Sequence, residues 1–534
     1  MQMLFALTLC MLLSSCHQNP KATEEGAASS RVPHQQLIIL RPCPSFAETG
    51  KPALVYGAEC GELLVKENPA DSNSSEISLN ILRLPAISPA AAQDPLFLIQ
   101  GGPGGSSVDM ATVVHRAFDD VRKNRDLIFV DQRGTGKSNP LLCEQLTPAD
   151  ELLPEDEQTR KSHTLIKSCA EKYRARVPFY TTPYAVQDLD SVRSALGYAK
   201  INLWGGSYGT RVALEYLRKF PQHARTAILD GVAPVQIALP KYFATDALAA
   251  LEAVNKECKV QEKCHSLYGD IVEKAATVVQ HLSQTQSNGE PVHIAFDHPR
   301  HQQLTHLNLT PKSFSSLLFM SLYSRDLTVL LPRSIADAER GDYRLMASLS
   351  ALATEQASFT DISDGMRYSV ICNEDAHFIS AEDIATAKPF FGMNMLKDLS
   401  DSCALWPKAI LPKTYNDPIS SDIPTLLLSG NHDPVTPSHW AELVAKNLTH
   451  ALQVVAPGGN HSISMEGCLP KIIAQFLELG KIEGIDTACV KNIVPLPLVL
   501  GANERKPSSF SSATMRSSSS YPSSARSSAT SAAP

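Results

Sequence analysis

The feature that most constrains the fold is a short apolar run that ends in a glycine-rich turn, because the chain repeats it. Residues 95–100 read PLFLIQ and lead into GGPGG, and DLIFVDQRGTG from Asp126 has the same design. INLW at 201–204 leads into GGSYG in the same way. Continuous apolar runs of this length indicate strands that are buried on both faces, which is typical of parallel sheets.

Amphipathic segments separate these runs and predict helices between the strands. One helix is expected at 183–196, where Thr182 caps the helix and Pro183 suits its first turn. Another is expected at 208–220, followed by a strand in TAILDGV from Thr226. Alternating strands and helices predict an α/β fold with a doubly wound, mostly parallel sheet.

The pattern changes between residues 236 and 408, where apolar residues fall at helical spacing and strand signals are sparse. The strand pattern returns with TLLLS at 425–429 and LQVV at 452–455. We therefore expect a mostly helical insertion at 236–408, between two parts of the α/β core at 46–235 and 409–500.

The two ends of the chain are expected to lie outside this fold. Residues 1–16 carry an apolar run that is too short to span a bilayer but suits a signal peptide. This segment ends in LSSC, which resembles a bacterial lipobox and makes Cys16 the candidate lipidation site. A leader with an unmodified Cys16, cleaved or uncleaved, is the alternative. Residues 17–45 are expected to form a tether, and the serine-rich residues 507–534 a disordered tail.

Cysteine usage favours export. Ten cysteines remain when Cys10 and Cys16 are set aside, and an even number is typical of disulfides in an oxidising compartment. Many pairings are open, and we favour neighbours in chain order, which gives five short loops. No C-x-x-C or H-E-x-x-H spacing occurs, so we expect no metal and no cofactor. The expected location is the cell envelope on the periplasmic side, or the secreted fraction, with membrane contact only through the lipid anchor.

Composition limits the kind of partner. The 534 residues are 43% hydrophobic, enough for a large core, and the net charge of −7 argues against nucleic-acid binding. RGTGKS at 133–138 looks like the end of a phosphate-binding loop, but Asp131 stands where that loop requires glycine. We expect Asp131 and Arg133 to bracket a buried turn instead. The oligomeric state is not set by the sequence.

One of the glycine turns carries a candidate nucleophile. GGSYG around Ser207 matches G-x-S-x-G, a pattern that exposes a serine on a strained turn between a strand and a helix. A serine hydroxyl is a poor nucleophile without an adjacent base, an acid that orients this base, and donors for the oxyanion. The alternative is a plain glycine turn in which Ser207 only caps the helix, but the flanking strand and helix favour the nucleophile.

The base and the acid are expected in two later loops, because the order in this fold is serine, acid, histidine. Asp433 follows TLLLS directly, in SGNHDPVTP, and His461 follows LQVV, in APGGNHSIS. His432 is the rival histidine, but it stands too close to Asp433 along the chain to be its obvious partner.

An oxyanion hole needs two backbone N–H groups. Tyr208, directly after the serine, is expected to supply the first. Gly101 or Gly102 is expected to supply the second, because a loop without side chains lets the backbone approach a substrate carbonyl. A plain glycine turn is again the alternative.

These ordered motifs resemble those of the prolyl and tripeptidyl aminopeptidases, serine peptidases of the α/β-hydrolase fold. The resemblance covers about residues 61–489, through QGGPGG, DQRGTGKS, GGSYGTR, LDGVAP, GNHDPVTP and GGNHS. It implies that Ser207 is the nucleophile, Asp433 the orienting acid and His461 the general base. It also implies a peptide substrate that loses residues from its N-terminus, and a helical cap formed by the insertion.

The resemblance further implies how a substrate amine is held. Family members use carboxylates near the cap, and Glu374 and Asp375 in ICNEDAHF are the candidates, with a solvated acidic turn as the alternative. Gln100 stands where prolyl aminopeptidases often carry histidine, which is closer to the tripeptidyl branch. An esterase or amidase acting on small acyl substrates is the second hypothesis, because the same machinery cleaves esters. A non-catalytic binding protein is a remote third, since all three triad members are present.

Overall fold

The computed structural model of the chain describes residues 37–44, 55–147, 150, 153–288, 292–358 and 362–501. The expected leader with Cys16, most of the expected tether and the serine-rich tail lie outside these residues. The elements below belong to the compact unit that begins at Ile38.

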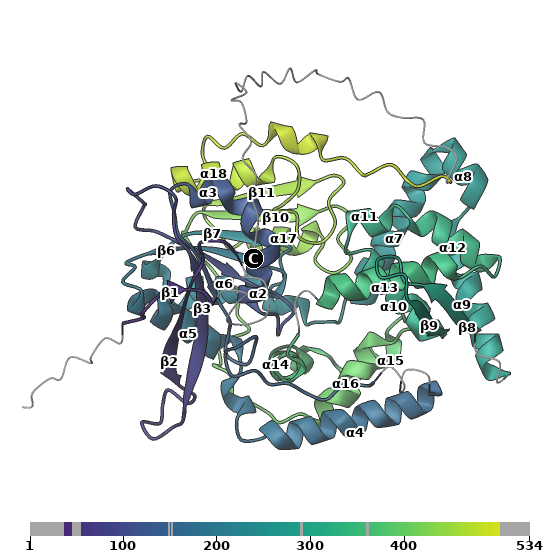
Figure 1. Cartoon of the computed structure of the whole chain (residues 1–534), viewed down its shortest axis with the longest axis horizontal. Coiled ribbons are helices and arrows are strands. Elements are labelled where there is room, and N and C mark those ends of the chain that lie inside the picture. The colour runs from purple at the N-terminus through teal and green to yellow at the C-terminus, as the bar shows by residue number, and fades with distance from the viewer. Residues whose placement is uncertain are drawn as a thin grey trace, which may run out of the picture. The chain divides into compact units, whose positions relative to one another are not determined.

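The centre of this unit is one mixed sheet, to which the described residues contribute nine strands (Figure 1). In spatial order the strands are β1 (Arg41–Pro42), β2 (Glu59–Lys66), β3 (Glu76–Leu84), β5 (Leu127–Val130), β4 (Leu96–Ile99), β6 (Ile201–Gly206), β7 (Ala224–Asp230), β10 (Thr425–Gly430) and β11 (Ala451–Ala456). The pairs from β1 to β5 are antiparallel, and every pair from β5 to β11 is parallel. The predicted fold class, an α/β-hydrolase with a mostly parallel sheet, is confirmed, and the antiparallel part is the addition.

Helices cover both faces of the sheet because its central strands are apolar on both sides. In β4, Phe97 and Ile99 pack in the core that includes α5 (Thr182–Ala195) and α6 (Tyr208–Lys219). Leu96 and Leu98 pack in the opposite core, which includes α2 and α18. Each such side chain, at most 1% exposed, contributes about 1.5–3 kcal/mol of burial free energy. Outside the segment between β7 and β10, the other α-helices of the described residues are α2 (Ser107–Val114), α3 (Asp119–Arg122), α4 (Glu155–Tyr173), α17 (Ser438–Ala445) and α18 (Leu469–Leu479).

Between β7 and β10 the chain forms mostly helices. They are α7 (Phe243–Val260), α8 (Glu262–Tyr268), α9 (Ile271–Ser287), α10 (Pro311–Ser321), α11 (Arg325–Thr328), α12 (Leu331–Glu339), α13 (Arg344–Ser358), α14 (Asp364–Val370), α15 (Ala381–Thr386) and α16 (Met395–Leu405). An antiparallel hairpin, β8 (Val292–Asp297) and β9 (Leu304–Leu309), was not predicted. Helices α7 to α10, α12 and α13 share a second core, whereas α14 and α16 contact α4 (Figure 1).

The ten cysteines of the described residues form five disulfides. All of them join neighbours in chain order, as predicted: Cys43–Cys60, Cys143–Cys169, Cys258–Cys264, Cys372–Cys403 and Cys468–Cys489. Five disulfides indicate an extracytoplasmic protein, because reducing compartments do not maintain them. No helix within the described ranges is both long and apolar enough to cross a membrane.

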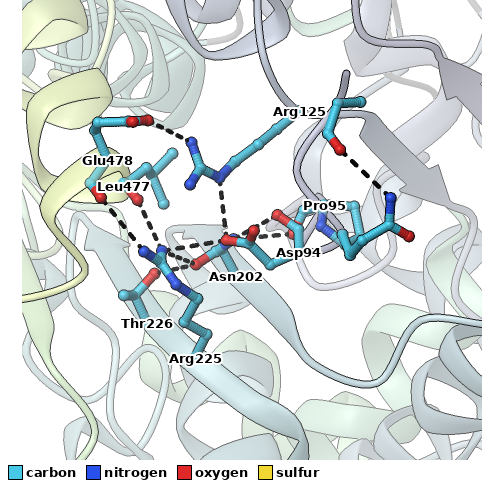
Figure 2. A network of polar contacts seen from close by, with 10 residues as sticks. Asp94, Pro95, Arg125, Asn202, Arg225, Thr226, Leu477 and Glu478 are labelled. Atoms are coloured by element: carbon cyan, nitrogen blue, oxygen red, sulfur yellow. Dashed lines mark hydrogen bonds and ion pairs between the residues drawn. The ribbon is translucent and has the colours of Figure 1, made fainter. Parts of the chain in front are cut away.

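A polar network ties α18 to the beginnings of the sheet strands (Figure 2). The side-chain NH2 of Asn202 donates to the Asp94 carboxylate at 3.0 Å. The side-chain oxygen Oδ1 of Asn202 accepts from the Thr226 hydroxyl at 2.6 Å and from Arg225 at 3.1 Å. Arg125 donates to Asp94, also at 3.0 Å, and reaches α18 through Glu478. This network lies at the end of β6 opposite to Ser207, so it supports the sheet without entering the candidate site.

The segment that resembles a phosphate-binding loop forms a buried turn, as expected. The Asp131 carboxylate accepts from the Ser106 hydroxyl at 2.7 Å and from the backbone N–H of Val108 and Lys137 at 3.0 and 3.1 Å. Arg133 is fully buried and forms a two-point ion pair with Asp188 at 2.7 and 2.8 Å.

Candidate active site

Ser207 lies on a sharp turn between β6 and α6. Its φ of 56° and ψ of −125° are strained for a residue with a side chain. The glycine after Tyr208 makes the turn possible, because a Cβ on Gly209 would lie 2.2 Å from the Ile99 carbonyl oxygen. The structure therefore gives the G-x-S-x-G motif the predicted strand–turn–helix setting.

The two predicted partners of the serine are bonded to each other. His461 Nδ1 lies 2.9 Å from Asp433 Oδ2, and their side chains are 10% and 0% exposed. The second Asp433 oxygen accepts from the backbone N–H of Val435 and Thr436, at 2.9 and 2.8 Å. These donors fix the carboxylate, which in turn holds the imidazole through Nδ1, so that Nε2 is the ring nitrogen not used in this pair.

Burial and charge compete at this pair. Burial favours the neutral imidazole, but the Asp433 carboxylate and the more distant Asp230 outweigh it and raise the pKa of His461. Burial also opposes ionisation of Asp433, whereas His461 and the N–H groups of Thr436 and Val435 lower the pKa of this carboxyl below its ordinary value. The pair is thus an ionised carboxylate that stabilises an imidazolium when one forms.

Two further residues complete the pair, and sequence reasoning missed both. The Thr436 hydroxyl donates to Asp433 Oδ2 at 2.7 Å and lies 3.1 Å from His461 Nδ1. The available signal was its place three residues after the acid, in DPVT. Tyr323, which follows α10, packs edge-on against the His461 ring with 5.0 Å between centroids. The inserted segment therefore contributes to the surroundings of the histidine.

Asp230, at the end of β7, links the serine turn to the histidine loop. Its carbonyl oxygen accepts from the Ser207 backbone N–H at 2.8 Å. Its carboxylate, 1% exposed, accepts from the backbone N–H of Ile463 and Ser464, both at 2.8 Å. The adjacent Gly231 lies so close to the His461 ring that a Cβ there would be 3.2 Å from Cε1. The serine and the histidine thus lie against the same strand end, although 254 positions separate them along the chain.

His432, the rival histidine, lies elsewhere. It is 4% exposed, and its Nε2 is 2.9 Å from the Glu257 carboxylate on α7. It is therefore engaged with the inserted segment and not with Asp433.

The glycine loop after β4 lies against the serine turn. A Cβ on Gly101 would lie 2.8 Å from the Ser207 Cβ and 3.3 Å from the Tyr208 backbone nitrogen. The Gly101 N–H is already bonded to the Gln100 side chain at 3.0 Å. Of the two glycines considered, Gly102 is therefore the better candidate for the second oxyanion donor beside Tyr208.

Glu374 and Asp375 lie in the interior, where protein groups and not solvent surround them. Both are 0% exposed. Asp375 forms a two-point ion pair with Arg211 at 2.8 and 2.9 Å, and Glu374 accepts from the Thr182 backbone and hydroxyl at 2.6 and 2.8 Å and from Tyr415. Burial raises the pKa of both carboxyl groups, with Arg211 working against it. Their oxygens are occupied by protein donors, so neither the open amine site nor the solvated acidic turn describes them.

The same contacts correct the predicted start of α5. Thr182 was expected to cap this helix, but it is the first helical residue and Thr181 precedes it as the capping position. The Thr182 side chain instead bonds to Glu374, which also accepts the Thr182 N–H. A carboxylate from far along the chain replaces the local cap.

The sheet order, the strained serine turn and the histidine–carboxylate pair at the strand ends define a serine hydrolase with the α/β-hydrolase fold. Two family models match the chain: one described as alpha/beta hydrolase fold over residues 94–266, and one described as TAP-like protein over residues 388–489. The chain is therefore an α/β-hydrolase whose residues 388–489 match the TAP-like family.

Relatives of known name agree with this family. The chain is 25% identical to serine protease Hip1 of Mycobacterium tuberculosis, over 83% of this chain and 89% of that protein. It is 30% identical to tripeptidyl aminopeptidase of Streptomyces lividans, over 33% of this chain and 35% of that protein. It is also 25% identical to putative hydrolase YuaR of Escherichia coli, over 86% and 93% of the two chains.

Proposed function

We propose that the chain is an exported serine exopeptidase that releases residues or short peptides from a peptide N-terminus through an acyl-enzyme. The observation that carries the proposal is the placement of Ser207 and the His461–Asp433 pair against one strand end, at Asp230 and Gly231. The names of two relatives, a serine protease and a tripeptidyl aminopeptidase, support a peptide as the substrate.

In the proposed reaction, His461 takes the hydroxyl proton of Ser207 while Oγ attacks the carbonyl carbon of the scissile bond. Asp433 accepts a hydrogen bond from Nδ1–H of His461 and stabilises the imidazolium. The N–H groups of Tyr208 and Gly102 hold the negative charge that develops on the carbonyl oxygen. The imidazolium then protonates the leaving amine, and a water molecule activated by the same imidazole hydrolyses the acyl-enzyme. Apart from the hydrolytic water, these steps use side chains and backbone of this chain.

The proposal is tested with three substrates: a free-amine peptide p-nitroanilide, the N-acetylated form of the same peptide, and a simple p-nitrophenyl ester. An exopeptidase cleaves the first and loses most of its kcat/KM when the amine is blocked. Equal turnover of blocked and free peptides points to an endopeptidase, and activity on the ester alone points to an esterase. Either result rejects the exopeptidase.

We also propose that Cys16 carries the lipid that holds the protein at the cell envelope. The five disulfides support an oxidising compartment, and LSSC supports the modification site. Metabolic labelling with a fatty-acid analogue should mark the full-length protein and not its Cys16→Ser variant. Equal labelling of both would exclude this anchor.

A further inference from the structure

Tyr208, the residue directly after the nucleophile, is anchored through its buried side chain. It is 1% exposed, and its phenol oxygen lies 2.6 Å from the Thr182 hydroxyl. That hydroxyl is bonded in turn to Glu374 Oε2 at 2.8 Å. A chain of hydrogen bonds therefore runs from Tyr208 through Thr182 to Glu374, and all three members are at most 1% exposed.

The face of the Tyr208 ring is held as well. The Arg211 guanidinium carbon lies 5.7 Å from the ring centroid, at cation–π distance. Asp375 fixes this guanidinium by its two-point ion pair and accepts the Leu239 N–H at 2.9 Å. Arg211 also approaches Glu374 Oε2 at 3.5 Å, which joins the two carboxyl groups into one network.

Both carboxylates come from a single turn of π-helix at Ile371–Asp375, between α14 and α15. π-Helical turns are rare and occur frequently at functional sites. This turn follows β7 by more than a hundred residues, yet it bonds to the first residue of α5 and reaches the first residue of α6 through it. The segment between β7 and β10 is thus linked through Thr182 to the residue that follows the nucleophile.

We propose that Glu374 and Thr182 are positioning residues, which hold the Tyr208 side chain and thereby aim the Tyr208 backbone N–H at the oxyanion. The N–H belongs to the residue that begins α6 just after the strained Ser207, where a rotation of the peptide plane meets little helical restraint. An oxyanion donor acts only within about 2.7–3.1 Å of the developing charge. Side-chain anchoring therefore sets how well the hole is formed. This role depends on the proposed function, because it requires an acyl-transfer reaction.

Tyr208→Phe and Thr182→Val break the hydrogen-bond chain at its two hydroxyl groups. Each is expected to lower kcat by about 10-fold to 100-fold at nearly unchanged KM, less than the 10²–10³ for losing an oxyanion donor outright. The loss should be equal for the free-amine peptide and for the simple ester, because both form an oxyanion. Affinity for a peptide aldehyde, which mimics the tetrahedral intermediate, should fall by the same factor as kcat/KM.

Tyr216→Phe is the matched control. Tyr216 is a buried tyrosine on the same helix, and its phenol donates to the Asp190 carboxylate at 2.8 Å, away from Ser207. Tyr216→Phe should match Tyr208→Phe and Thr182→Val in thermal stability and retain the wild-type kcat. Thr182→Ser keeps the bridging hydroxyl and should restore kcat. The double variant Tyr208→Phe/Thr182→Val should have a kcat no lower than that of the more impaired single variant, since either change already breaks the same chain of hydrogen bonds.

Two outcomes overturn the proposal. If only free-amine substrates lose activity, with KM rising and ester hydrolysis intact, then Thr182 and Glu374 act in amine recognition. If Tyr208→Phe and Thr182→Val behave like Tyr216→Phe, the network only stabilises the fold. Failure of the proposed function looks different, because it is seen in the wild-type protein alone: blocked and free peptides are cleaved equally, only the ester is cleaved, or no substrate is cleaved.

Discussion

Gly101→Ala is the substitution whose effect on the site follows most directly from the structure. The added methyl group would lie 2.7 Å from the Gly206 carbonyl oxygen and 2.8 Å from the Ser207 Cβ. Both distances are shorter than a van der Waals contact, and each involves an atom of the serine turn, so the two loops must separate. The methyl carbon would also lie 3.3 Å from the Tyr208 nitrogen, close to where an oxyanion would accept that N–H.

We therefore expect Gly101→Ala to lower kcat/KM by about 10²–10³, the cost of losing one oxyanion donor, or about 2.7–4 kcal/mol of transition-state stabilisation. The assay is hydrolysis of the free-amine peptide p-nitroanilide, with thermal unfolding measured in parallel. Gly197→Ala is the matched control: Gly197 has φ +81° and nothing within 4 Å of an added Cβ. This control should lose about 1 kcal/mol of stability through backbone strain and keep its kcat/KM. A folded Gly101→Ala protein with wild-type kcat/KM would refute the reasoning.

Three other perturbations separate the candidate site from its scaffold. Asp230 is one of the groups that raise the pKa of His461, and His461 must be neutral to act as a base. Asp230→Asn should therefore move the acidic limb of the kcat/KM–pH profile to lower pH, and a move to higher pH would contradict this. Cys372→Ser/Cys403→Ser opens a loop of sequence separation 31 and should cost about 3 kcal/mol in urea unfolding, which an unchanged midpoint would disprove. Asn202→Ala removes the centre of the network in Figure 2 and should cost about 1–3 kcal/mol without changing kcat/KM; a large kinetic loss would show that the network reaches the site.

The sequence was sufficient where one local pattern decides the outcome. β4 and β10 are short apolar runs buried along their whole length, and each was predicted within two residues of its bounds. β5 is a run of the same kind, and its start was predicted within one residue. β2, β3 and the hairpin β8–β9 were missed, because β3 and β8 alternate buried and more exposed residues, β2 and β9 have one buried residue each, and all four carry charged or polar side chains. A two-residue period in short segments is a weaker signal than a continuous apolar run.

Contacts between distant segments could not be predicted from local pattern. Glu374 and Asp375 were predicted as candidates for holding a substrate amine, but their partner Arg211 stands more than 160 positions earlier and could not be foreseen. Thr182 has the sequence of a helix cap, yet its hydroxyl bonds to Glu374, 192 positions away. The two carboxyl ends of β7 and β10 bring Asp230 and Asp433 near one histidine, and only strand order reveals this.

The central claim is that Ser207 is activated by His461 and attacks an acyl carbon, and covalent labelling tests it most directly. A fluorophosphonate probe is added to the wild-type protein and to Ser207→Ala and His461→Ala, and the adduct is located by peptide mass spectrometry. The account predicts one adduct on Ser207, none in Ser207→Ala, and strongly slowed labelling in His461→Ala. An adduct on a different serine, or unchanged labelling in Ser207→Ala, would contradict it.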